Sequence, residues 1–113
     1  VADLVRDALR MRPDRIVVGE MRDGAAALEA LKAWNTGHPG GVSTIHANSA
    51  RESLLRLEDL LGEVMAQNPA RVIAQAIDLI VHIARRPDGR AVEPILVLDG
   101  IDPDGGYRCH ASA

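Results

Sequence analysis

The 113-residue sequence contains no phenylalanine, one tryptophan and one tyrosine, so its hydrophobic core has to be built from aliphatic side chains. No segment approaches the roughly 18 consecutive uncharged apolar residues of a membrane-spanning helix, which excludes such a helix. A hydrophobic content of 47% with a formal net charge of -3 also excludes an intrinsically disordered chain. These values predict one ordinary globular domain, expected in the cytoplasm.

Cysteine and lysine are equally scarce. The only cysteine, Cys109, has no partner for an intramolecular bridge, so a disulfide-stabilised scaffold is excluded. Lys32 is the only lysine, and 16 acidic residues outnumber 13 basic ones. Because the chain lacks a basic stripe interleaved with aromatic side chains, direct sequence-specific binding of nucleic acid is not expected.

The first half of the chain has the pattern of a βαβ unit. Residues 2–11 predict a short helix that ends before Pro13. Residues 15–20 form a β-branched run without alternation, which is typical of a central parallel strand covered on both faces. An alanine-rich helix is predicted over residues 23–35 and a second strand over residues 42–46. Since βαβ crossovers are right-handed and join parallel strands, we expect these two strands to pair in parallel.

The second half changes from helices to strands. A capping-box pair opens a helix predicted over residues 49–67, and an Asn-Pro pair opens another over residues 68–77. Three strands joined by turns follow at 79–84, 92–98 and 107–110, which favours an antiparallel meander. The fold class predicted from the residues is therefore α/β, with a parallel βαβ unit, further helices and a C-terminal antiparallel meander.

An ionisable residue follows each strand of the βαβ unit, Glu20 after the first and His46 after the second. Parallel pairing places both at the carboxyl edge of the sheet, where open α/β sheets bind ligands. A carboxylate there can hold a hydrated magnesium ion or orient a water molecule beside a phosphate, and an imidazole can hydrogen-bond a phosphoryl oxygen. Alternatively, each is a solvated strand end, with Glu20 paired to Arg22.

Glycines surround these positions. Gly19 would let a ligand or the backbone approach closely before Glu20, and a cluster at positions 37, 40 and 41 flanks His38. Such glycines suit a loop that meets a nucleotide, and they suit plain turns equally well.

The sequence gives less support to two other hypotheses, a metal site and a serine nucleophile. His38 and His46 could be paired metal ligands, but Cys109 and His110 lie on a separate predicted strand without a matching spacing. The serines of segment 43–49 lack the G-x-S-x-G elbow of a nucleophilic serine.

Two segments resemble the sequence boxes of a known superfamily. Residues 12–22, Arg-Pro-Asp-Arg-Ile-Val-Val-Gly-Glu-Met-Arg, resemble the Walker B segment of the secretion and traffic ATPases. Residues 33–49, Ala-Trp-Asn-Thr-Gly-His-Pro-Gly-Gly-Val-Ser-Thr-Ile-His-Ala-Asn-Ser, resemble their histidine box. The superfamily includes type IV secretion motors and pilus-retraction motors, and the Ala-Trp-Asn-Thr-Gly-His segment is most similar to the TrbB family of conjugal-transfer ATPases. The resemblance covers essentially all 113 residues and is looser after residue 53.

The resemblance implies a hexameric motor that hydrolyses ATP with Mg²⁺ at subunit boundaries. Such a motor powers conjugative DNA transfer, type IV secretion or pilus assembly. It would lie in the cytoplasm, peripherally associated with the bacterial inner membrane and with inner-membrane secretion or conjugation components.

The same resemblance assigns roles by motif. Glu20 is similar to the Walker B acid, which positions or activates the hydrolytic water through magnesium. His46 is similar to the box histidine that approaches the terminal phosphate. Gly19 precedes the Walker B acid, and Thr44 and His38 take supporting positions at the nucleotide. The residues that resemble phosphate or inter-subunit contacts are Arg22, Arg10 and Arg12.

Three parts of such motors are missing from the sequence: the N-terminal domain, the acidic box and the phosphate loop of Walker A. The phosphate loop, G-x-x-x-x-G-K-[ST], needs a lysine, and Lys32 lies inside a predicted helix. The resemblance therefore implies that residues 1–113 are the C-terminal part of a RecA-like P-loop NTPase core, which alone binds nucleotide weakly and turns over none. An exposed sheet edge should make this part self-associate. Two alternatives are a non-catalytic assembly module of the same fold and a pilus-retraction motor.

Overall fold

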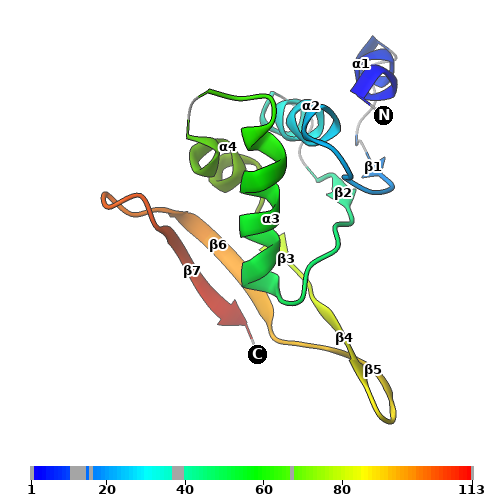
Figure 1. The fold of residues 1–113 in the computed structure, drawn as a ribbon, viewed down its shortest axis with the longest axis vertical. Helices are drawn as coiled ribbons and strands as arrows, with labels where there is room; N and C mark the ends of the chain where they lie inside the picture. Colours follow the sequence, from blue (N-terminus) through cyan, green and yellow to red (C-terminus); the bar gives the residue numbers. More distant parts are fainter. Residues whose placement is uncertain (1, 11–14, 16, 37–39, 67, 113) are drawn as a thin grey trace.

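The computed structural model describes residues 2–10, 15, 17–36, 40–66 and 68–112. Helices dominate the first two thirds of the chain and strands the last third (Figure 1). In chain order the elements are α1 (Ala2–Arg10), β1 (Val17–Val18), α2 (Gly24–Asn35), β2 (Val42–Ser43), α3 (Ala50–Gly62), α4 (Pro69–Ala76), β3 (Leu79–Ile80), β4 (Ile83–Arg86), β5 (Gly89–Val92), β6 (Ile95–Ile101) and β7 (Tyr107–Ser112).

Three helices begin where local sequence signals place them. The side chains of Asp23, Ser49 and Asn68 each accept a hydrogen bond from a backbone amide in the first turn, at 2.8, 3.0 and 3.0 Å. Each bond satisfies an amide that has no partner within its helix. The predicted helix starts are therefore confirmed, but α3 ends at Gly62 rather than near residue 67, since glycine disfavours continued helix.

The two strands of the front half pair in parallel, as the βαβ pattern predicts. Val17 is in register with Val42, and Val18 with Ser43. Among the described residues, β1 and β2 form a sheet of two strands. Within this part of the chain, only one face of β1 is covered by the core. Val18 is 6% exposed against the core, whereas Val17 is 71% exposed. The prediction of a central strand covered on both faces is therefore wrong for this structure, and Ile16 lies outside the described residues.

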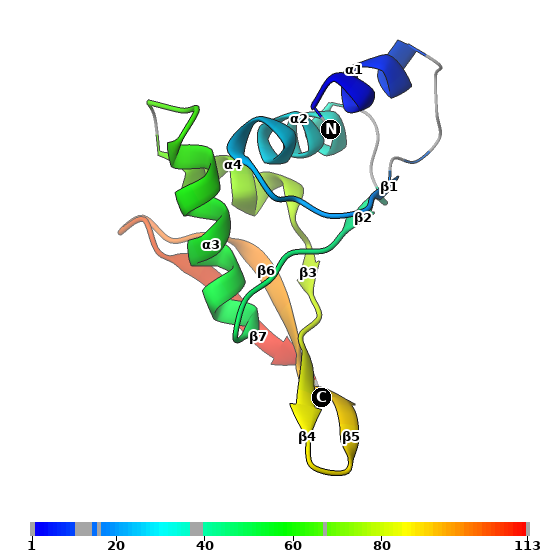
Figure 2. The same ribbon diagram turned by 45° about the vertical axis from the view of Figure 1, so that its right-hand side comes forward.

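The strands at the end of the chain are antiparallel, but they form two sheets instead of one meander. The sheet order β3-β6-β7 is separate from the β4–β5 hairpin, which projects away from the helices (Figure 2). The strand predicted at 79–84 is thus divided between β3 and β4, and the one at 92–98 between β5 and β6. Pro94 lies at the second break, where its missing amide removes a ladder donor.

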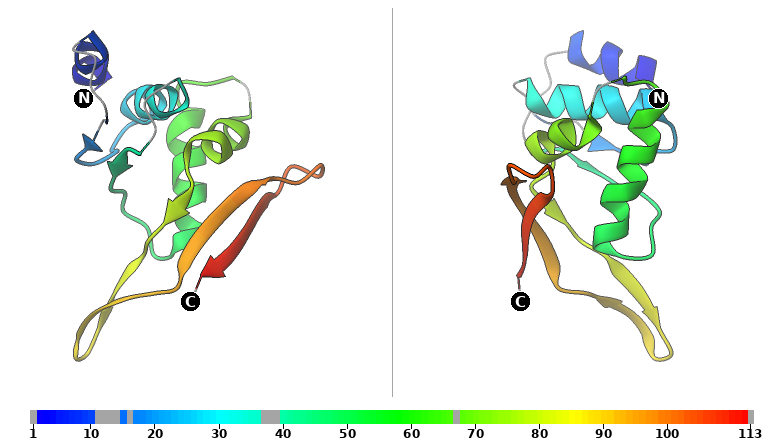
Figure 3. Two further views of the ribbon diagram at one scale, coloured as in Figure 1. Left: turned by 180° about the vertical axis from the view of Figure 1, so that it is seen from behind. Right: turned by 60° about the vertical axis from the view of Figure 1, so that its left-hand side comes forward.

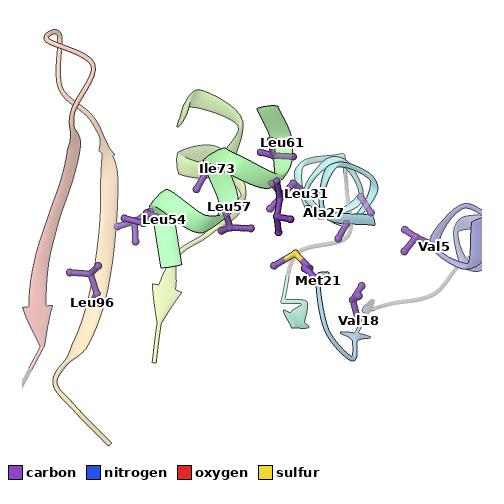
Figure 4. Packing of buried hydrophobic residues seen from close by; sticks show 14 residues of the cluster. Val5, Val18, Met21, Ala27, Leu31, Leu54, Leu57, Leu61, Ile73 and Leu96 are labelled. Atoms are coloured by element: carbon purple, nitrogen blue, oxygen red, sulfur yellow. The ribbon is translucent and has the colours of Figure 1, made fainter. Parts of the chain in front are cut away.

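The core lies between helices α2, α3 and α4 and one face of β6. Leu31, Leu61 and Ile73, one from each helix, have the largest fully buried side chains (Figure 4). Leu96 and Leu98 of β6 extend this aliphatic cluster, and α3 and α4 lie against the β6–β7 ribbon (Figure 3). Among the described residues, none of the helices has the length and apolarity that a bilayer crossing needs.

Candidate functional site

The two strand-end residues lie side by side. Because β1 and β2 run in parallel, the segments that follow them emerge at the same edge, with Glu20 after β1 and His46 after β2. Nε2 of His46 is 3.1 Å from Oε1 of Glu20, and Nε of Arg22 donates a hydrogen bond to Oε2. The Glu20 side chain is 20% exposed, whereas the His46 imidazole is 96% exposed. The acid is thus held in place, and the imidazole faces solvent.

The contacts around Glu20 favour its charged form. The hydrogen bond from Arg22 has the largest effect and lowers the pKa of Glu20. Desolvation opposes it by raising this pKa, and the charges of Arg22 and His46 each lower it by a smaller amount. In return, Glu20 raises the pKa of Arg22. The edge therefore presents a carboxylate that stays anionic well below neutral pH.

A second contact ties the two strand ends together. The hydroxyl of Thr44 donates a hydrogen bond of 2.6 Å to the carbonyl oxygen of Gly19, and the amide of Met21 donates one of 3.0 Å to the carbonyl of Thr44. A Cβ added at Gly19 would meet no described atom within 4 Å. The described residues thus give no packing reason for this glycine, and its surface beside Glu20 is open.

An open pocket of about 390 Å³ lies against this edge. Two guanidinium groups, one imidazole and one carboxylate face it. That balance of charge suits an anionic ligand, because guanidinium groups bind phosphate and carboxylate oxygens in bidentate fashion. The lining residues are Glu20, Met21, Arg22, Ile45, His46 and Arg56.

Arg56 is the lining residue that sequence reasoning missed. It lies on α3, and no motif or spacing in the sequence distinguishes it from the other arginines. Only the packing of α3 beside the two strand ends brings it to the pocket. A helical projection shows the exposed face of a helix but not what lies opposite it.

The side chains of three other predicted site residues are not placed by the structure. His38 and Arg12 lie outside the described residues, and so does the side chain of Arg10, at the end of α1. Gly40 has a φ of +83°, and a Cβ at Gly41 would overlap the indole of Trp34. These two glycines thus serve a left-handed turn and a close contact with Trp34.

Magnesium fits this edge only through intervening water. Oε2 of Glu20 accepts a hydrogen bond from Arg22 and Oε1 lies 3.1 Å from Nε2 of His46, so both oxygens already have a partner. Mg²⁺ commonly keeps several waters and is bound by one or two carboxylates together with ligand phosphates. In the ranges that the structure describes, no three His, Cys, Asp or Glu residues are grouped so that they could hold a metal ion.

The sequence profile of the family described as "Type II/IV secretion system protein" matches residues 1–112. The chain belongs to this family. It is 56% identical over 99 residues to the probable conjugal transfer protein TrbB of Sinorhizobium fredii. This alignment covers 88% of this chain and 30% of that protein. It is 35% identical over 89 residues to the type IV secretion system protein VirB11 of Bartonella quintana. This alignment covers 74% of this chain and 25% of that protein.

Solved structures show the same fold. The VirB11 ATPase of the Brucella suis type IV secretion system, in complex with sulphate, matches 83% of this chain and 30% of its own with a TM-score of 0.74 and 27% identity. The pilus retraction motor PilT with bound ADP matches 99% of this chain and 29% of its own with a TM-score of 0.62 and 27% identity. The predicted α/β fold of a RecA-like ATPase core is thereby confirmed. The family member described here spans 25–30% of the length of these relatives.

Proposed function

We propose that this chain supplies the phosphate-facing edge of a motor ATPase that powers conjugative DNA transfer or type IV secretion. The observation that carries the proposal is the 3.1 Å approach of His46 to Glu20 at the carboxyl edge of two parallel strands. The positively charged pocket beside this edge supports it. So does the similarity to proteins named for conjugal transfer and type IV secretion.

Each side chain has a role that its surroundings allow. Glu20, kept anionic by Arg22, accepts a hydrogen bond from the attacking water and orients it. His46, exposed beside it, donates a hydrogen bond to an oxygen of the terminal phosphate of ATP. Thr44 and Gly19 hold the two strand ends in register. A bound Mg²⁺ ion would neutralise the charge of the phosphates.

The assembly belongs to the same proposal. The parent protein forms a ring, taken to be a hexamer, with nucleotide at subunit boundaries, and it works in the cytoplasm against inner-membrane components. Lys32 lies within α2, so it supplies no phosphate-loop lysine. The 113 residues alone are therefore proposed to hydrolyse no ATP.

Glu20→Gln in the full-length parent tests this proposal. The substitution keeps the shape of the side chain and removes its charge, so we expect hydrolysis to fall by about 10² or more while nucleotide still binds. The matched control is Glu63→Gln, an exposed acid at the end of α3, which should leave turnover unchanged. Turnover and binding of a fluorescent ATP analogue are measured together. A Glu20→Gln parent with normal turnover refutes the motor function and favours a non-catalytic assembly module.

A pilus-retraction motor is the second candidate, and the likeness to PilT over 99% of this chain favours it. The two candidates differ in what stops when the Glu20→Gln variant replaces the parent in its host. Loss of conjugative DNA transfer supports the first, and loss of pilus retraction with normal transfer supports the second.

A further inference from the structure

The β4–β5 hairpin stands apart from the hydrophobic core cluster of the described residues, which includes none of the hairpin's own. It projects beyond the helices as a two-stranded arm (Figures 1 and 2). Its residues are exposed except for the half-buried pair Ala84 and Ala91. A hairpin of two strands is marginally stable by itself in water, so an arm of this kind gains stability from a partner.

One face of this arm carries both charge and apolar surface. Ile83 pairs with Val92, and Arg85 pairs with Arg90. Paired residues, and residues two apart on one strand, lie on the same side, so these four side chains form one surface, here called the hairpin face. Ile83 is 58% exposed and Val92 is 62% exposed.

The two arginines of the hairpin face are not neutralised within the chain. Like charges placed directly opposite in an antiparallel pair are destabilising. In the part of the chain that the structure describes, neither Arg85 nor Arg90 has a salt bridge or a side-chain hydrogen bond; the seven ion pairs involve other residues. The hairpin face thus combines two guanidinium groups with two large exposed apolar side chains. A complementary partner surface would present carboxylates beside an apolar group.

One exposed row on the outer side of α3 has the complementary chemistry. The outer side of this helix also carries two exposed arginines, Arg51 and Arg56. Glu52, Leu55 and Asp59 follow one another at helical spacings of three and four residues, which places them on one exposed row, here called the α3 row. Leu55 is 59% exposed, and neither acid has an ion pair with another described residue. From Leu55 to Asp59 the helix rises by about 6 Å. Two residues of a strand, as from Ile83 to Arg85, span about 6.6 Å.

We propose that the hairpin face of one copy docks on the α3 row of a second copy. Ile83 and Val92 then cover Leu55, and the two arginines meet the carboxylates of the α3 row. The two surfaces differ, so the contact is head-to-tail, and repeated contacts close into a ring or extend as a filament. The contact rests on the self-assembly proposed above and assigns residues to it.

Other partners fit the hairpin face less well. A chain with a net charge of -3 and 2% aromatic residues lacks the general attraction and the stacking groups that nucleic acid needs. The tip of the arm is Arg-Pro-Asp-Gly, at residues 86–89, and the apolar pair lies nearer the body. A bilayer would therefore have to admit the polar tip before the apolar pair.

Charge reversal with rescue tests the contact on the purified 113-residue chain. Sedimentation velocity over a range of concentrations gives the dissociation constant for self-association. The variant Arg85→Glu with Arg90→Glu should weaken association at least tenfold, and added salt should weaken the association of the unaltered chain. The control Arg71→Glu, at an exposed arginine of α4, should associate as the unaltered chain does.

The rescue variant adds Glu52→Arg and Asp59→Arg to the reversed hairpin. If the two surfaces meet, this swap restores association to within a few-fold of the unaltered chain. Circular dichroism verifies folding, and Arg85→Gln with Arg90→Gln replaces the reversal should the latter unfold.

Several outcomes overturn the contact. The contact is refuted if the charge reversal leaves association unchanged. It is also refuted if the reversal abolishes association and the rescue variant does not restore it. A reversal that abolishes binding to phosphatidylglycerol vesicles but leaves self-association intact identifies a membrane as the partner instead. An unaltered chain that stays monomeric refutes the contact alone, since the motor function is judged by turnover of the Glu20→Gln parent.

Discussion

The helical layer and the exposed strands use the same aliphatic side chains with opposite results. Leu31, Leu61 and Ile73 in the helices are fully buried, whereas Val17 and Val92 in the strands are more than half exposed. Three helices bury one another's apolar stripes, because each needs cover on a single face. A strand needs partners along both edges and often on both faces, so β1, β2 and the hairpin remain open. Stability thus resides in the helical layer, while the candidate site and the docking arm lie on the open strands.

The largest effect expected from this contrast comes from truncating a core leucine. Leu61→Ala should lower the free energy of unfolding by about 2–5 kcal/mol, because it removes buried apolar surface and leaves a cavity between the helices. Leu4→Ala makes the same change on α1 at a side chain that is 69% exposed, and it should stay within about 0.5 kcal/mol. Urea denaturation followed by circular dichroism measures both. Equal losses in the two variants would show that burial of Leu61 between the helices is not what stabilises the fold.

A smaller effect is expected where the start of α2 closely approaches the backbone of α3. A Cβ at Gly24, the first residue of α2, would overlap the backbone carbonyl of Leu60 in α3, so Gly24→Ala should cost about 1–3 kcal/mol. Gly62→Ala is the matched control. A Cβ there meets nothing within 4 Å, and alanine favours helix, so this variant should be as stable or more stable by up to about 1 kcal/mol. The same denaturation experiment compares them, and a tolerated Gly24→Ala would show that α2 and α3 can separate at little cost.

A third effect concerns the helix start that the sequence signalled. Asp23→Ala removes the acceptor for the Ala26 amide and should cost about 1 kcal/mol, whereas Asp23→Ser retains a cap and should recover most of it. Equal stability of the alanine and serine variants would mean that the α2 cap contributes nothing. Because the cap acts within one turn, this loss should be smaller than either loss in the core.

Features governed by near neighbours could be predicted from the sequence. Helix caps at Asp23, Ser49 and Asn68 depend on residues two or three positions away, and the structure has all three. The parallel pairing of β1 and β2 follows from chain direction once a helix joins them, so the meeting of Glu20 and His46 was also predictable.

Features governed by distant partners could not be predicted. The division of the back strands into β3–β6–β7 and a separate hairpin depends on which edges meet in space. The exposure of Val17 depends on which elements pack against β1. The hydrophobic sequence of β1 indicates only that burying it would be favourable. Arg56 reaches the pocket because α3 packs beside the strand ends, which no local pattern encodes.

The smallest effect is a shift in the titration of Glu20 on the open strands. Arg22→Gln removes the hydrogen bond and the charge that lower the pKa of Glu20, so that pKa should rise toward or above the ordinary value of 4.5. The folded-state pKa lies below the unfolded value, so the contribution of this pair to stability is present above about pH 4.5 and is lost as pH falls through the folded-state pKa.

Carboxyl carbon resonances followed by NMR across acidic pH measure the midpoint directly, with Arg71→Gln as the control that should not move it. An unmoved midpoint in Arg22→Gln would mean that His46 or the backbone, rather than Arg22, keeps the acid charged. The Glu20 side chain is 20% exposed and that of Arg22 is 84% exposed, so water screens the interaction between them. We therefore expect a measurable shift in the pKa of Glu20. The accompanying loss in the free energy of unfolding should be smaller than that of any of the variants in the helical layer.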